Sequence, residues 1–249
     1  MPRTHATLPR LFVASSLGPG AAVPLDAAQS HYLTTVLRLK KGSQVVAFNG
    51  RDGAWRTGLL TPSRKGAELV PIERIARQTE PADLWYFFAP LKAGRLDYMV
   101  QKATEMGVSH LQPVITRFTQ ASRVNLDRMR VNVVEAAEQC EVLSLPVVHD
   151  SVPLARLIEA WPEDHFGRRL IFADEAAVSG SPIEALRAVG GDPLGLIVGP
   201  EGGFSEEERA LLLAQKFVLP VSLGPRILRA DTAAVAALAA IQASIGDWR

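Results

Sequence analysis

The chain has 249 residues, of which 47% are apolar and 21% are charged. This is the composition of an ordinary globular protein, built as one large domain or as a small domain beside a larger one. Lys and Arg number 27 against 26 Asp and Glu, so a site for a polyanion has to be a local patch. The single cysteine, Cys140, excludes an internal disulfide. No apolar run has membrane-spanning length, and the N-terminus does not look like a signal peptide. We therefore expect a cytoplasmic protein with no membrane association.

The five histidines are scattered along the sequence and show no spacing typical of metal ligands. No nucleophile motif for covalent catalysis is present either. We therefore expect no metal and no covalent intermediate formed through this chain.

The first 76 residues predict a small β-rich domain. Asp26 is placed to cap a short helix that continues to about residue 37. Three segments with alternating apolar residues follow, at 44–48, 54–60 and 67–72, separated by turn residues. Such a pattern is typical of β-hairpins.

Basic residues gather on this β-rich part. A solvated domain surface is the simpler interpretation of their charge, but Lys and Arg on turns can also follow an RNA backbone. The residues that we assign to this role are Arg38, Lys40, Lys41, Arg64 and Lys65.

From residue 77 onward, strands and helices alternate. Strands are predicted at 84–89, 111–115, 169–173, 194–198 and 217–223, and helices at 96–106, 125–142, 153–161, 183–189 and 231–245. This alternation predicts an α/β domain with a mostly parallel sheet covered on both faces. The last helix is rich in alanine and apolar on most sides, so we expect it to be buried in the domain or against a second copy.

Two of the predicted strands end in Gly-Pro loops, and there we expect a ligand site. Strand 194–198 runs into Gly199-Pro200-Glu201-Gly202-Gly203, and strand 217–223 runs into Gly224-Pro225-Arg226. Ligands of α/β domains bind at the carboxyl ends of strands. A tight turn that requires glycines is the simpler interpretation of the first loop taken alone. The motifs for nucleoside triphosphates and for dinucleotides are absent, which disfavours those ligands.

Arg226 and Arg229 lie shortly before the last helix. Two guanidinium groups beside a helix N-terminus would stabilise an anion well. The alternative, equally favoured by the local sequence, is that Arg229 pairs with Asp231 or Glu201 for structural reasons.

Four stretches of the sequence, taken together, are a more specific signal of a protein family than each is alone. They are QKATEMGV at 101–108, EAAEQC at 135–140, GPEGGFS at 199–205 and LGPRILRADTA at 223–233. They closely resemble the uridine-N3 methyltransferases of small-subunit ribosomal RNA of the RsmE type, in the SPOUT superfamily. The resemblance implies a PUA-like RNA-binding barrel at 1–76 and a methyltransferase domain of SPOUT type at 77–249. It also implies a C-terminal trefoil knot and a homodimer.

The resemblance further implies that S-adenosyl-L-methionine is the cofactor and that N3 of a specific uridine in 16S ribosomal RNA is methylated. Arg229, together with Arg226, would stabilise the charge on the uridine. The sequence does not identify the general base, for which Glu201 and Asp231 are the candidates. Lys102 is assigned to RNA binding. The cofactor residues are expected to be Leu196, Ile197, Val198, Gly199, Pro200, Glu201, Gly202, Gly203, Leu223, Gly224, Ile227, Leu228 and Thr232.

Two alternatives stay open. The first is a non-catalytic RNA-binding or ribosome-assembly protein with the same fold. The second is a methyltransferase that acts on another RNA, such as transfer RNA.

Overall fold

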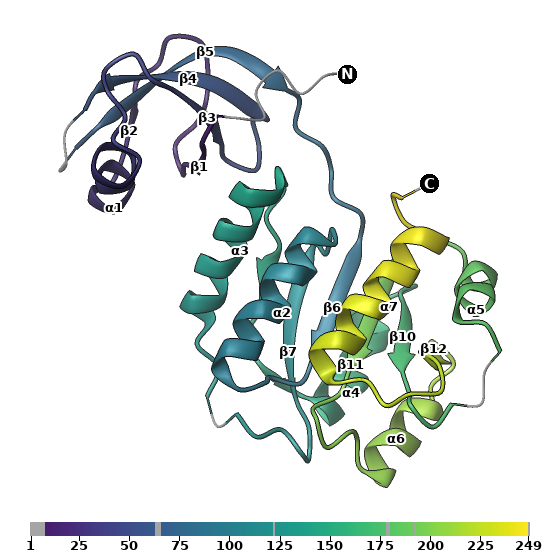
Figure 1. Ribbon diagram of the computed structural model, residues 1–249. Helices are drawn as coiled ribbons and strands as arrows, with labels where there is room; N and C mark the ends of the chain where they lie inside the picture. The colour runs from purple at the N-terminus through teal and green to yellow at the C-terminus, as the bar shows by residue number, and fades with distance from the viewer. Residues whose placement is uncertain (1–7, 63–65, 122, 178–179, 192, 249) are drawn as a thin grey trace. The chain divides into compact units, whose positions relative to one another are not determined.

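The computed structural model describes residues 8–62, 66–121, 123–177, 180–191 and 193–248 (Figure 1). The chain divides into two compact units. The first comprises residues 1–80 with 137–145, and the second comprises residues 81–136 with 146–249.

The first unit is built on a five-stranded sheet with the order β1-β3-β4-β5-β2. Its strands are β1 (Arg10–Phe12), β2 (Val23–Pro24), β3 (Gln44–Phe48), β4 (Ala54–Thr61) and β5 (Glu68–Ala76). Strand β4 pairs antiparallel with both β3 and β5, which confirms the predicted hairpins. The sequence did not predict β1 and β2, because segments of two or three residues are too short to show an alternating pattern.

The predicted helix begins where it was expected but ends in a wider turn. Asp26 caps α1 (Ala27–His31): its carboxylate accepts a hydrogen bond from the Gln29 N–H at 2.7 Å, and Gln29 Oε1 accepts one from the Asp26 N–H at 3.1 Å. The chain then continues as one π-helical segment, η1 (Tyr32–Val36). We attribute the wider turn to the β-branched run Thr34-Thr35-Val36, which crowds a regular helical turn.

The second unit is the predicted α/β domain. Its strands are β6 (Leu84–Phe88), β7 (His110–Ile115), β8 (Val147–Val148), β9 (Val152–Pro153), β10 (Arg169–Ala173), β11 (Leu194–Val198) and β12 (Val218–Val221). The main sheet has the order β12-β10-β11-β6-β7-β8, and every pairing in it is parallel, as the sequence predicts. Strand β9 pairs with β7.

Helices cover both faces of this sheet (Figure 1). They are α2 (Ala93–Glu105), α3 (Leu126–Cys140), α4 (Leu154–Asp164), α5 (Pro182–Val189), α6 (Glu206–Leu213) and α7 (Ala230–Ser244). Helices α2 and α7 pack side by side on one face, and α4 and α6 lie together on the other. The burial expected for the alanine-rich helix α7 is confirmed, because α7 packs against α2, α5 and β11. None of the helices described is long and apolar enough to cross a membrane.

Three histidines that are far apart in the sequence meet around Trp85 near the amino ends of the strands. The ring of His110 stacks on Trp85 with centroids 4.0 Å apart, and His110 Nδ1 lies 2.9 Å from His149 Nε2. His165 packs edge-on against the same indole at 4.7 Å. Burial lowers the pKa of His110 and of His165 to about 4. These rings are therefore neutral at pH 7 and belong to the apolar packing.

Candidate functional site

A cavity of about 240 Å³ lies at the carboxyl ends of three neighbouring parallel strands. Its walls are the segments that follow β10, β11 and β12, together with the first turn of α7. The loops after adjacent parallel strands emerge on the same edge of a sheet, so they enclose a crevice there. The cavity lies where the sequence placed the ligand site.

Most of the predicted cofactor and catalytic residues line this cavity. They are Val198, Gly199, Pro200, Glu201, Gly203, Leu223, Gly224, Arg226, Ile227, Leu228 and Arg229.

Four predicted cofactor residues lie elsewhere. Leu196 and Ile197 are buried inside the unit, because they precede the last residue of β11 and are covered by the layers on either side of the sheet. Gly202 lies against Phe118, on the other side of its loop. Thr232 is exposed on α7. The predicted residues that line the cavity are thus the loop residues and the residues next to them.

One wall of the cavity was not predicted from the sequence. It is formed by the end of β10 and the turn after it, residues 172–176, with Phe204, Arg209, Ala230 and Ala233 completing the lining. The sequence predicted β10 as a strand but could not place it between β11 and β12. With that strand order known, the carboxyl-end rule would have identified this wall.

An ion pair holds the β10 wall in place. The side chain of Asp174 is only 3% exposed, and its Oδ2 accepts a hydrogen bond from Arg209 Nη2 at 2.8 Å. Arg209 Nε is a second donor to the same carboxylate at 3.1 Å, and the Ala176 N–H donates to Oδ1, also at 3.1 Å. This bonding compensates for burial of the carboxylate and raises the pKa of Arg209. We assign the pair to shaping the cavity wall.

Glu201 is paired with an arginine that lies outside the two Gly-Pro loops. Arg95 Nη1, in the first turn of α2, donates to Glu201 Oε1 at 3.1 Å. The alternative in which Glu201 pairs with Arg229 is therefore wrong.

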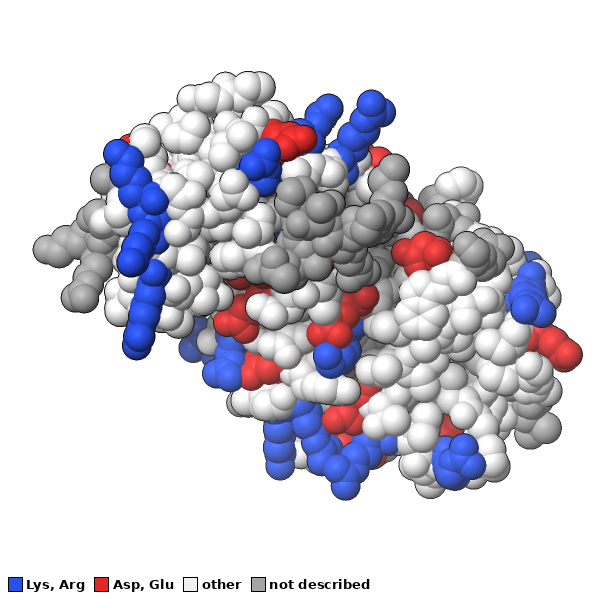
Figure 2. Space-filling model, turned by 45° about the horizontal axis from the view of Figure 1, so that its top comes forward, with Lys and Arg blue, Asp and Glu red and all other residues white. Residues whose placement is uncertain are grey.

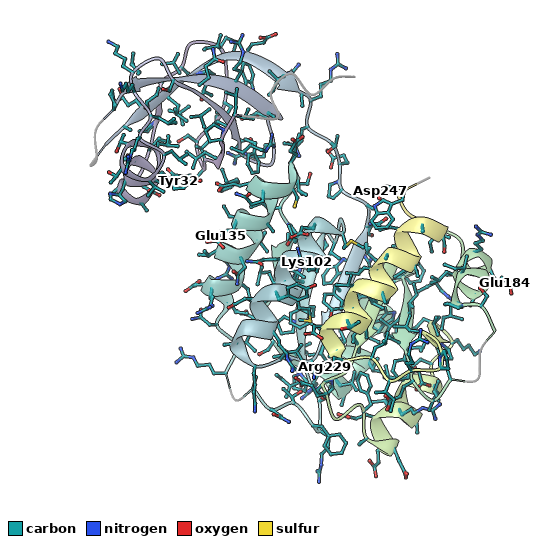
Figure 3. All side chains as sticks on the ribbon, viewed as in Figure 1. Tyr32, Lys102, Glu135, Glu184, Arg229 and Asp247 are labelled. Atoms are coloured by element: carbon teal, nitrogen blue, oxygen red, sulfur yellow. The ribbon has the colours of Figure 1, made fainter. Side chains whose placement is uncertain are left out.

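Arg229 stands at the N-terminal end of α7, as its N-cap residue (Figure 3). Its side chain is exposed, and no carboxylate among the residues described lies within 4.0 Å of it, so the pairing with Asp231 is also absent. Arg226 is likewise exposed and forms no ion pair with any described residue. Both arginines are among the residues that line the cavity, where an anionic group could meet them.

The glycines of the two loops are needed for different reasons. Gly203 has φ +70° and Gly224 has φ +105°, a backbone conformation that side chains other than glycine rarely adopt. A methyl group on Gly199 would lie 2.8 Å from the Phe204 ring. A tight turn therefore explains why residue 203 is a glycine. Residue 199 is a glycine for another reason, because a side chain there would collide with the Phe204 ring.

The residues assigned to RNA binding are distributed over both units. Arg38, Lys40 and Lys41 are exposed after η1 in the first unit, and Arg64 and Lys65 lie outside the described residues. Lys102 Nζ forms an ion pair with Glu105 at 2.7 Å, toward the end of α2 that is remote from Arg229 in Figure 3. In Figure 2 several Lys and Arg side chains lie in a row at the left of the view, whereas in the middle of the view basic and acidic side chains are interspersed.

Comparison with known proteins identifies the family. An RNA methyltransferase domain matches residues 78–242, and an RNA methyltransferase PUA domain matches residues 25–72. The chain belongs to this family of RNA methyltransferases. The expected α/β fold and PUA domain are thereby confirmed.

Relatives within the family are similar over nearly the whole chain. The ribosomal RNA small subunit methyltransferase E of Synechocystis sp. is 35% identical, over 94% of this chain and 77% of the relative. The enzyme of the same name from Rickettsia conorii is 29% identical, over 94% of both chains. A crystal structure of ribosomal RNA small subunit methyltransferase E from Neisseria gonorrhoeae, bound to S-adenosyl methionine, superposes with a TM-score of 0.82 at 26% identity. It covers 97% of this chain and 100% of the other.

Proposed function

We propose that this protein uses S-adenosylmethionine to methylate N3 of a uridine in small-subunit ribosomal RNA. One observation carries the proposal: a chain of the RNA methyltransferase family has a loop-lined cavity at the carboxyl ends of its strands, with Arg226 and Arg229 among the residues that line it.

The cavity suits the proposed cofactor. Its volume of about 240 Å³ is close to the lower end of the range for small-molecule sites, roughly 300–1,000 Å³. Leu223, Ile227 and Leu228 form an apolar wall, and Ile227 is 84% exposed, so a bound adenosyl group would cover it. The backbone groups of 199–203 and 223–224 would supply the polar contacts. When bound there, S-adenosylmethionine supplies an electrophilic methyl group.

Arg229 and Arg226 would then act on the uridine. Methylation at N3 requires that the base lose its N3 proton, which spreads negative charge onto the two carbonyl oxygens. Cationic groups that are already in place stabilise such charge most strongly where water is excluded. Arg229 suits this role because its backbone is fixed as the N-cap of α7 while its guanidinium has no ion-pair partner among the described residues.

Glu201 is our candidate for accepting the N3 proton. Three carboxylates line the cavity, those of Asp174, Glu175 and Glu201. Asp174 is held by Arg209, and Glu175 belongs to the β10 wall. Glu201 lies on the loop after β11 and is positioned by Arg95.

Replacing Glu201 by Gln tests this role. The methylation rate should fall most at low pH, where little hydroxide is available to take the proton instead. A rate that is reduced equally at every pH would contradict the role.

The first unit would hold the RNA. Its PUA match and the exposed Arg38, Lys40 and Lys41 support this assignment. Binding through phosphates weakens as salt rises. RNA affinity that stays constant between low and physiological salt would contradict it.

We also propose a homodimer, a trefoil knot formed by the C-terminal segment, and action in the cytoplasm. Half-buried small residues of α7, among them Val235, Ala236, Ala239 and Ala240, leave an apolar strip that a second copy could cover. Segment 223–229 and loop 199–203 line the same cavity, and α7, which follows segment 223–229, packs against β11. A chain whose C-terminal segment is threaded through a knot would need this arrangement. Light scattering tests the dimer: a mass of 26.9 kDa in solution would contradict it.

The deciding experiment is methyl transfer in vitro with mass mapping of the product. The purified protein is incubated with S-adenosylmethionine and with small subunits, small-subunit RNA or transfer RNA that lack the modification. We expect one 3-methyluridine in small-subunit RNA and none in transfer RNA. Methylation of transfer RNA alone would instead favour another substrate. Cofactor affinity without any methylation would favour an RNA-binding protein that has lost catalysis.

A further inference from the structure

An exposed aromatic side chain lies directly beside the loop that lines the cavity. Phe118 follows β7 and is 45% exposed. It packs against Gly202, where an added methyl group would lie only 3.2 Å from Phe118 Cβ. Because Gly202 is part of the 199–203 loop, Phe118 stands on the outer side of the same segment that forms the cavity wall.

The backbone that carries Phe118 is held on both sides of it. The Thr116 N–H donates to Thr119 Oγ1 at 2.9 Å, and the Thr119 N–H donates to the Thr116 carbonyl at 3.1 Å, which closes a tight turn. The Arg117 N–H donates to Glu208 Oε1 at 2.7 Å. The same Glu208 side chain accepts a hydrogen bond from the Ser205 N–H and so completes the cap of α6. The turn is therefore fixed to the element that follows the cavity loop, and the backbone position of Phe118 is fixed with it.

The surroundings of Phe118 suit a nucleobase. Arg117, Phe118, Thr119, Gln120 and Gly202 line a shallow hollow on the surface of the second unit. Arg117, the residue before Phe118, is exposed, and Gln120 offers a side-chain amide that can donate and accept. An aromatic face with a cation and an amide beside it is the set of groups that proteins use to bind splayed RNA bases.

A single exposed phenylalanine is common on protein surfaces and by itself indicates no site. Phe166 is an example, since it is 88% exposed just before β10 and does not line the cavity. Phe118 differs because its backbone is anchored, it contacts the cavity loop, and it lines a hollow together with the exposed Arg117.

We propose that Phe118 stacks on a base of the RNA substrate at or next to the target uridine, with Arg117 meeting the adjoining phosphate. This inference rests on the proposed function and adds a substrate-binding residue to it. A base that leaves its own stack to reach the cavity loses its neighbours. The ring of Phe118 replaces one of those contacts and keeps the nucleotide in register with the cavity.

The test compares Phe118→Ala, Phe118→Leu and Phe118→Trp with Phe166→Ala as the matched control. Stacking on an aromatic residue is worth roughly 5-fold to 100-fold in affinity per base. We expect Phe118→Ala to lower kcat/KM for small-subunit RNA and the affinity for RNA by about this factor. Phe118→Trp should recover most of the loss. Phe118→Leu, which keeps the apolar bulk without a ring face, should not.

The Kd for S-adenosylmethionine, the melting temperature and the mass in light scattering distinguish a loss of base stacking from other effects of the substitutions. The Kd for S-adenosylmethionine and the melting temperature should be unchanged in all four variants, because Phe118 is half-exposed and lies outside the cavity lining. RNA affinity and kcat/KM equal in Phe118→Ala and Phe166→Ala would overturn the proposal, as would full activity of Phe118→Leu. A variant that binds RNA normally but changes its mass in light scattering would also overturn it, by assigning Phe118 to a protein contact.

A failure of the proposed function can be distinguished from a failure of the proposal for Phe118. If the wild-type protein methylates no small-subunit RNA, that function is wrong. The RNA affinities of the Phe118 variants then still decide whether this ring binds a base.

Discussion

Arg95 Nη1 donates a hydrogen bond to Glu201 Oε1 at 3.1 Å and so ties the first turn of α2 to the loop after β11. Both side chains are partly exposed, Arg95 at 40% and Glu201 at 32%. Solvent therefore screens their attraction, and the pair contributes little to the stability of the fold. What it fixes is the direction of the Glu201 carboxylate beside the cavity.

Replacing Arg95 with Ala should therefore affect the site more than the fold. We expect the affinity for S-adenosylmethionine to fall, but by no more than about 5-fold, since partly exposed pairs are worth at most ~1 kcal/mol. The melting temperature should stay within about 2 °C of the wild-type value. Calorimetric titration and thermal melting check both. Arg130→Ala removes an exposed arginine–carboxylate pair within α3 and serves as the control. A large loss of stability in Arg95→Ala alone would show that the pair is structural.

The Asp174–Arg209 pair should behave in the opposite way. Arg209→Ala leaves a carboxylate that is 97% buried without its cation. We expect a loss of roughly 1–3 kcal/mol in the free energy of unfolding, less than for a fully buried pair because Arg209 itself is 38% exposed. Urea denaturation measures the loss. Arg156→Ala, which breaks the exposed pair with Glu159, should cost under about 0.5 kcal/mol. Equal losses in the two variants would mean that burial of Asp174 does not matter.

The sequence predicted the parts of the fold that depend on local patterns. The cap at Asp26, the hairpins and the parallel strands follow from residue preferences within a few positions. The loops after β11 and β12 could also be assigned to the site from local sequence, because each follows directly on an apolar run.

The remaining parts of the site depend on strand order, which local patterns do not encode. Strand β10 lies between β11 and β12, so its turn at Asp174 and Glu175 enters the cavity wall. Arg95 reaches Glu201 across a separation of 106 residues. The cluster of three histidines around Trp85 likewise forms only because parallel pairing sets Trp85 beside His110. The family resemblance supplied the cofactor and the substrate, which local patterns alone left open.

The histidine cluster makes stability depend on pH. In the folded protein burial lowers the pKa of His110 and His165 from 6.5 to about 4, so between these values the unfolded chain binds more protons than the folded one. The free energy of unfolding should therefore be level above pH 7 and fall as the pH decreases from 6.5 toward 4. Urea denaturation at several pH values between 7.5 and 5.5 measures the slope before most carboxylates titrate.

A variant of His165 tests the origin of this slope. His165→Phe keeps an aromatic ring against Trp85 and removes Nδ1, which is buried without a hydrogen-bond partner. We expect a smaller slope below pH 6.5, and stability at pH 7.5 no lower than in the wild type, because an unpaired buried polar atom is lost. His31→Gln, on α1 and outside the cluster, is the control. An unchanged slope in His165→Phe would assign the pH dependence to other groups.

Arg229 should matter for the chemical step more than for cofactor binding. Arg229 lines the cavity as the N-cap residue of α7, and its guanidinium has no ion-pair partner among the described residues. If it stabilises charge on the deprotonated uridine, Arg229→Ala should lower kcat by about 100-fold or more. The Kd for S-adenosylmethionine should change by less than about 3-fold, under 1 kcal/mol.

Two further variants make this prediction specific. Arg229→Lys keeps a positive charge but not the planar fork of donors, so it should recover only part of the activity. Arg187→Ala removes an exposed arginine of α5 and should leave kcat unchanged. Single-turnover rates at saturating cofactor, set beside calorimetric titration, separate chemistry from binding. If Arg229→Ala lost cofactor affinity and turnover by the same factor, Arg229 would be a binding residue for the cofactor, and the charge on the uridine would need another partner, with Arg226 the next to test.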